Sequence, residues 1–140
     1  MEFSGPGVSP REIEMAKKLV EWCLQAPTDT VLDPSFGGLV FLKGARERLL
    51  QLGADPTSVG SQICGIDVDD LALRAAAAEG TVADCRLLRA DFFRVRPSPE
   101  LTFTANLGNP PYVRYQAWNG SAKKAHAVAE DMGVPLTRLS

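Results

Sequence analysis

Residues 30–38 read Thr30-Val31-Leu32-Asp33-Pro34-Ser35-Phe36-Gly37-Gly38, and this stretch decides the fold that we predict. A short apolar run that ends in Asp, Pro and two glycines is typical of a buried strand followed by a tight turn into a helix. The run Ile63-Cys64-Gly65-Ile66-Asp67 repeats the pattern and also closes on an aspartate. Short, continuous apolar strands indicate a parallel sheet that is covered on both faces.

Helices are predicted before and between these strands. The first begins at Ser9, because Ser9 and Glu12 have the spacing of a capping box and Pro10 stands at the first helical position. Apolar residues then recur at helical spacing, so we expect an inward face made of Ile13, Ala16, Leu19, Val20, Cys23 and Leu24. Further helices are expected over residues 40–52 with Gly53 as the stop, over 71–79 behind an Asp69 or Asp70 cap, and over 121–132.

Two more strands, residues 85–89 and 101–106, complete the pattern. Strands that alternate with helices predict an α/β fold, here with about four mainly parallel strands and flanking helices. In such sheets ligands bind beyond the carboxyl ends of the strands. Polar or glycine-rich clusters follow all four strands, at Asp33 to Gly38, Asp67, Asp91 and Asn109 to Tyr112. Because these ends share one edge, the clusters together predict a single site.

Composition narrows the class of protein. The 140 residues are expected to form one domain, residues 1–140, and their net charge of −2 lacks the basic excess of a self-sufficient DNA binder. No apolar run reaches the ~20 residues that span a bilayer, so we expect no membrane partner. A single histidine excludes a His-based metal centre, and we expect no metal. Cys23, Cys64 and Cys85 are expected to be buried thiols of a cytoplasmic protein.

The first three clusters each have a functional and a structural interpretation. The glycines after Asp33 let backbone N–H groups approach a ligand, or form an ordinary turn, but they lack the spacing of a phosphate-binding loop. Asp67 can accept hydrogen bonds from a ribose diol, whereas a helix cap suits the aspartates that follow it better. Asp91 can bind an amine while Phe92 stacks on a purine; the alternative is a strand end with two core phenylalanines.

The fourth cluster, Asn109-Pro110-Pro111-Tyr112, is the most specific. An exocyclic amine on a nucleobase is a poor nucleophile, because its lone pair is delocalised into the ring. The Asn109 amide oxygen and the Pro110 carbonyl, whose direction the ring fixes, can hold both N–H groups and draw the nitrogen toward tetrahedral geometry. Tyr112 offers a flat face for a base taken out of its stack. Neither an ordinary turn nor a polyproline ligand requires an amide, a rigid carbonyl and an aromatic ring together.

With these motifs in this order, the chain resembles the gamma-type amino-adenine DNA methyltransferases, especially the methylase parts of fused type II restriction–modification enzymes. The resemblance covers all 140 residues, and a motif X segment before motif I is its most diagnostic feature. Motif X corresponds to residues 8–10 with the first helix, and motifs I to IV to residues 31–42, 65–69, 90–92 and 107–115. The resemblance implies an incomplete Rossmann-like methyltransferase sheet, S-adenosylmethionine as cofactor, and N6 of adenine in double-stranded DNA as acceptor.

Carried over residue by residue, the resemblance assigns roles to two sets of residues. Asp33 and Gly37 would face the methionine part of the cofactor, with Pro34 in the same cofactor-binding turn, Asp67 would hold the ribose, and Asp91 and Phe92 the adenine. The catalytic set would be Asn109 and Pro110 on the target amine, then Pro111, and Tyr112 on the flipped base. Methyl transfer would be a direct in-line displacement that rests mostly on orientation.

Two departures from the family pattern shape this expectation. Ser35-Phe36 and Gly38-Leu39 replace the family's Ala-Cys and Ser-Gly pairs, so Leu39 stands where the last glycine is expected. The resemblance also stops before the family's later strands and target-recognition domain. We therefore expect an amino-terminal portion whose activity alone stays open, and whose DNA contacts come mostly from the missing part or a partner polypeptide. The alternatives are a glutamine-N5 or RNA guanine-N2 methyltransferase, which share Asn-Pro-Pro-Tyr, and a non-catalytic remnant or subunit.

Overall fold

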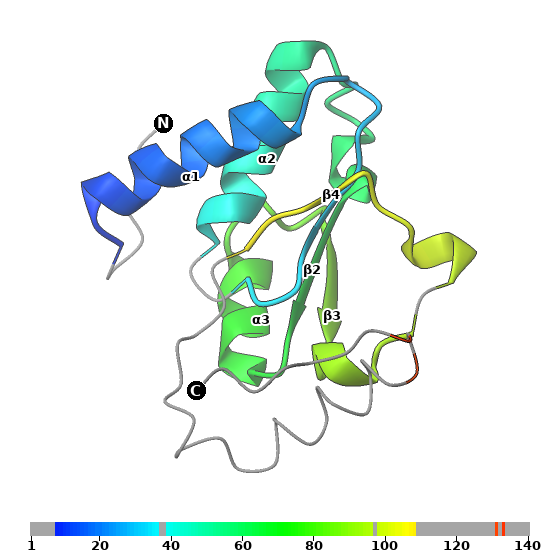
Figure 1. The fold of residues 1–140 in the computed structure, drawn as a ribbon. Coiled ribbons are helices and arrows are strands. Elements are labelled where there is room, and N and C mark those ends of the chain that lie inside the picture. The colour runs from blue at the N-terminus through cyan, green and yellow to red at the C-terminus, as the bar shows by residue number, and fades with distance from the viewer. Residues whose placement is uncertain (1–7, 37–38, 97, 109–130, 132, 134–140) are drawn as a thin grey trace, which may run out of the picture.

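The computed structural model describes residues 8–36, 39–96, 98–108, 131 and 133. Its helices and strands follow in the order α1 (Pro10–Cys23), β1 (Val31–Asp33), α2 (Val40–Leu52), β2 (Ile63–Asp67), α3 (Asp70–Ala78), β3 (Arg86–Arg89) and β4 (Ala105–Asn106). Short 3₁₀ turns cover Val59–Gln62, Phe92–Arg94 and Pro99–Leu101. The four strands form one parallel sheet in the order β3-β2-β1-β4, so the predicted α/β fold with about four parallel strands is confirmed (Figure 1).

The strand order creates a switch point between β1 and β4. From β1 the chain adds β2 and then β3 on one side, and afterwards places β4 on the other side of β1. The connections on either side of β1 therefore run in opposite directions, which places the topological switch point at the carboxyl ends of β1 and β4. Ligands of open α/β sheets bind at such a switch point.

The predicted helix boundaries are mostly confirmed. The Ser9 Oγ accepts a hydrogen bond from the Glu12 N–H at 3.3 Å, and the Glu12 carboxylate accepts one from the Ser9 N–H at 2.8 Å, which completes the capping box. Of the two candidate caps for α3, Asp69 is the one that accepts a bond from the helix, from Leu71 N–H at 2.9 Å. Helix α2 ends at Gly53, whose φ of +103° is a conformation that glycine adopts without strain.

Both faces of the sheet are covered. The three helices lie on one face (Figure 1) and share a core with the strands, built from Val20, Leu24, Val31, Leu42, Ala45, Leu49, Ile63 and Ala76. On the other face Leu32, Cys64 and Ile66 are buried and pack against Ala90, Val95 and Phe103, which flank β3 and β4. Burial on both faces explains why β1 and β2 are continuous apolar runs rather than alternating ones.

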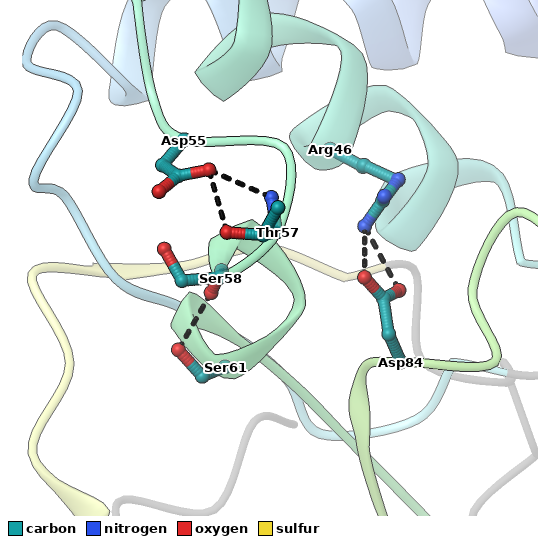
Figure 2. Close-up of polar contacts among 6 residues, drawn as sticks. All are labelled: Arg46, Asp55, Thr57, Ser58, Ser61 and Asp84. Carbon is teal, nitrogen blue, oxygen red and sulfur yellow. Dashed lines mark hydrogen bonds and ion pairs between the residues drawn. The ribbon is translucent and has the colours of Figure 1, made fainter.

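The connection from α2 to β2 is held by local polar contacts (Figure 2). The Asp55 carboxylate accepts bonds from the backbone N–H and the hydroxyl of Thr57, both at 2.8 Å. Nearby, the Nη1 of Arg46 in α2 donates to both carboxylate oxygens of Asp84, at 2.8 Å to Oδ1 and 2.7 Å to Oδ2. Helix α2 is thereby tied to the loop that enters β3.

Several sequence predictions are corrected. Leu19 is 41% exposed rather than inward, and Cys23 is only partly buried, whereas Cys64 and Cys85 are buried as expected. The fourth strand is much shorter than the predicted 101–106: residues 99–101 form a 3₁₀ turn, and pairing with β1 begins only after Thr104 meets Thr30. The helix predicted over 121–132 lies outside the described residues except for Asp131. In the described part of the chain, no helix is both long and apolar enough to span a membrane.

Candidate functional site

Strand β4 is held in register beside β1 by two threonines. Thr30 N–H donates to Thr104 Oγ1 at 2.8 Å, and the Thr104 hydroxyl and N–H donate to the Thr30 carbonyl at 2.9 and 3.0 Å. At the other end of the pair, Leu107 N–H donates to the Leu32 carbonyl at 2.9 Å. This register brings Gly108 against Asp33: a Cβ atom built on Gly108 would lie 2.9 Å from Asp33 Oδ1.

Asp33 is the buried acid at the end of β1. Its side chain is 2% exposed, and its Oδ1 accepts a hydrogen bond from the Ser35 N–H at 3.0 Å, which shapes the turn after the strand. Burial raises the pKa of Asp33 to about 7, and the negative charge of Asp67 adds to the effect. None of the ion pairs found among the described residues involves Asp33.

Asp67 ends β2, and Asp91 lies two residues beyond the end of β3. The Oδ1 of Asp67 accepts the Asp69 N–H at 2.9 Å, and the Oδ1 of Asp91 accepts the Phe93 N–H at 3.1 Å. The Ala90 N–H donates to the Asp67 carbonyl at 3.0 Å, so the segment that carries Asp91 lies beside Asp67. Each of three neighbouring strands thus has, at its carboxyl end or just beyond it, an aspartate with one oxygen that accepts a hydrogen bond from the backbone two residues on.

Phe92 follows Asp91 at the same edge of the sheet. Its side chain is 43% exposed, and its ring lies 6.0 Å from that of Phe93, tilted by 58°. The interpretation of this segment as a strand end with two core phenylalanines is therefore wrong for Phe92. An exposed aromatic ring next to a carboxylate can stack on a planar ligand.

Leu39 begins α2 in a backbone conformation that is unusual for leucine. Its φ of +63° and ψ of −1° are left-handed, the conformation that glycine favours. Its side chain is buried, and it begins α2 without a side-chain cap. Position 39 therefore combines a backbone conformation typical of glycine with an apolar side chain that belongs to the core.

The structure describes five of the ten residues that the sequence predicts for the site. Asp33, Pro34, Asp67, Asp91 and Phe92 all lie at the carboxyl edge of the sheet, on β1, β2, β3 or the turns that follow them. The other five, Gly37, Asn109, Pro110, Pro111 and Tyr112, lie outside the described residues. Gly108 was not predicted as a site residue; its one sequence signal is a glycine directly after a strand end.

The edge is acidic and aromatic, which limits what it can bind. Carboxylates accept hydrogen bonds from hydroxyl, amine and ammonium groups, and a buried one favours a positively charged partner. In the described segments no three His, Cys, Asp or Glu side chains are grouped closely enough to hold a metal ion. The edge is thus suited to an organic ligand with donor groups and a flat ring.

Fold and site together define an α/β protein with a parallel sheet, a topological switch point between β1 and β4, and aspartates along the carboxyl edge of the sheet. Neither a scan against protein-family models nor a search of curated proteins finds a match to this chain.

Proposed function

We propose that this chain is the catalytic fold of a Rossmann-like S-adenosylmethionine-dependent methyltransferase that acts on an exocyclic nucleobase amine, N6 of adenine in DNA. One observation carries the proposal. The buried Asp33 lies at the switch point in contact with Gly108, and Gly108 is the residue directly before Asn109-Pro110-Pro111-Tyr112. A candidate cofactor carboxylate and the candidate amine-activating motif thus start from adjacent strand ends.

The cofactor fits the hydrogen-bond acceptors at the edge. S-adenosylmethionine carries an ammonium group and a carboxylate on its methionine part, a sulfonium, a ribose diol and an adenine, so it offers two positive charges against one negative charge, several donors and a flat ring. Asp33 would face the cationic methionine end, Asp67 would accept bonds from the ribose, and Asp91 would accept from the adenine amine beside Phe92. Bonds between such donors and a carboxylate contribute roughly 1.5–3 kcal/mol each.

The residues after Gly108 supply the acceptor side. The bound cofactor provides an electrophilic methyl group. Asn109 and Pro110 would hold the two N–H groups of the amine with fixed acceptors, which localises the lone pair on nitrogen for in-line attack. As the nitrogen–carbon bond forms, the carbon–sulfur bond of the sulfonium breaks and its electron pair stays on sulfur, so that S-adenosylhomocysteine leaves as a neutral thioether. The methylated amine, positively charged after the attack, then loses one N–H proton to solvent. Tyr112 would stack on the base once it has left the duplex, a contribution of about 1–3 kcal/mol.

The test is transfer of a labelled methyl group to competing acceptors. The chain is incubated with methyl-labelled S-adenosylmethionine and, separately, with an adenine-containing DNA duplex, a structured RNA and a glutamine-bearing protein factor. We expect the label in adenine of the duplex, and its loss in Asn109→Ala. Label in RNA or protein alone would instead identify a guanine-N2 or glutamine-N5 enzyme. Cofactor binding with no transfer to any acceptor would identify a non-catalytic subunit.

A further inference from the structure

The contact with the Asp33 carboxyl group explains why residue 108 is a glycine. Its φ is outside the left-handed region, and the residue is exposed, so neither backbone conformation nor core packing requires glycine there. The space that a side chain would take is filled by the Asp33 carboxyl group, with Oδ1 at 2.9 Å and Cγ at 3.6 Å from an ideal Cβ, and by Pro34 Cδ at 3.3 Å.

The contact fixes one particular oxygen. Oδ1 of Asp33 is the atom that accepts the Ser35 N–H bond, and it is also the atom nearest to the missing Cβ of Gly108. The carboxyl group is therefore held between the turn after β1 and the end of β4. Because Thr30 and Thr104 lock the other end of the same strand pair, neither side can shift along its strand without breaking hydrogen bonds.

We propose that Gly108 is a positioning residue for Asp33: because it has no side chain, the end of β4 leaves room for the Asp33 carboxyl group in the position where Oδ1 accepts the Ser35 N–H bond. The inference rests on the proposed function, since it assigns to this contact the task of orienting the carboxyl group toward the cofactor. A side chain at position 108 would push the carboxyl group off its Ser35 bond, so the site would lose its geometry without any change in its charged groups.

The matched pair of variants is Gly108→Ala and Gly80→Ala. A Cβ on Gly80 meets nothing within 4 Å, and its φ is not positive, so this variant controls for the general cost of replacing glycine. Binding of labelled S-adenosylmethionine is measured by equilibrium dialysis, well below the melting temperature of each variant. The Ser35 amide proton resonance reports the turn bond. We expect Gly108→Ala to weaken binding at least tenfold and to shift the Ser35 resonance, and Gly80→Ala to change neither.

The outcomes separate the two proposals. If the wild-type chain binds and Gly108→Ala binds equally well, the positioning role is wrong and the proposed function stands. If the wild-type chain does not bind, the proposed function fails and the positioning role fails with it. Should Gly108→Ala be too unstable for the binding measurement, thermal denaturation of the wild type, both single variants and Asp33→Ala/Gly108→Ala decides: a loss of Tm from Gly108→Ala that is smaller in the Asp33→Ala background supports the contact, and equal losses overturn it.

Discussion

The ring of Phe36 lies across Gly65, the residue of β2 that pairs with Asp33 of β1. A Cβ atom on Gly65 would lie 2.6 Å from Phe36 Cδ1 and 3.2 Å from Leu42 Cδ1. Phe36 itself is 2% exposed. The turn after β1 is therefore anchored by an aromatic ring that fits against the sheet only because β2 has no side chain at this position.

Gly65→Ala is expected to destabilise the fold. The added methyl group meets a buried ring with no open space to move into, and overpacking of this kind costs typically about 1–3 kcal/mol. Urea denaturation should show a lower midpoint than wild type. Phe36→Leu/Gly65→Ala should recover part of the loss relative to Gly65→Ala, and additive effects of the two substitutions would contradict the contact.

At position 39, the glycine variant should be more stable than the alanine variant, which is the reverse of the usual order inside a helix. Both Leu39→Ala and Leu39→Gly lose a buried side chain, at a cost of roughly 2–5 kcal/mol. Because a left-handed backbone costs a non-glycine residue roughly 1–2 kcal/mol, Leu39→Gly should be more stable than Leu39→Ala by about 1 kcal/mol. At Leu42, inside α2, the same two substitutions should show the opposite order. Finding the same order at both positions would rule out the left-handed conformation of Leu39.

Asp33 should make the fold less stable as the pH rises. Its pKa is about 7 in the folded chain and near 3.8 when unfolded, so between these values the folded state holds a proton that the unfolded state has lost. The contribution of Asp33 to the free energy of unfolding is therefore most favourable below about pH 4, and it falls until about pH 7 by on the order of 4 kcal/mol. Asp33→Asn has no group that titrates here, so this fall should be absent from the variant.

The comparison is made by urea denaturation of wild type and Asp33→Asn at several pH values. The free energy of unfolding of Asp33→Asn should increase relative to that of wild type as the pH rises from 4 to 8. The difference between the two proteins isolates Asp33 from Glu12, Asp29, Asp55 and Glu79, whose lowered pKa values give the opposite trend. A difference that does not vary with pH would mean that Asp33 is ionised throughout.

Asp84→Asn, which removes the ion pair with Arg46, should lower the stability of the fold less than Gly60→Ala does. A Cβ on Gly60 would overlap the backbone oxygen and the carboxyl group of Asp84, so Gly60→Ala should cost about 1–3 kcal/mol. The Arg46–Asp84 pair of Figure 2 is partly exposed, with side chains 21% and 44% accessible, so Asp84→Asn should cost at most about 1 kcal/mol and less in high salt. Denaturation midpoints at two salt concentrations would measure both, and equal losses would be unexpected.

The sequence predicts local features of this fold well. The capping box at Ser9, the stop at Gly53 and the two buried strands depend on neighbouring residues, and all are found. The exposure of Leu19 could not be predicted, because it depends on how much of α1 its neighbours cover. The short β4 likewise depends on where Thr104 meets Thr30, 74 residues away in sequence.

The candidate site is predictable in part, because some of its features depend only on neighbouring residues in the sequence. The aspartates stand out because each follows an apolar run, and parallel strands bring their ends to one edge. That Leu39 takes a left-handed conformation cannot be inferred from a leucine. The contact between Gly108 and Asp33 requires β4 to lie beside β1 rather than beside β3, which the chain order does not specify.

We propose that the acidic edge of the sheet binds S-adenosylmethionine through the aspartates at the carboxyl ends of its strands. Calorimetric titration tests it directly, with wild type, Asp33→Asn, Asp67→Asn and the control Asp84→Asn, whose side chain pairs with Arg46 before β3 rather than at the carboxyl ends. We predict one site in wild type, binding at least tenfold weaker in Asp33→Asn and Asp67→Asn, and unchanged binding in Asp84→Asn. No binding to wild type, or equal binding in all four proteins, would contradict the account.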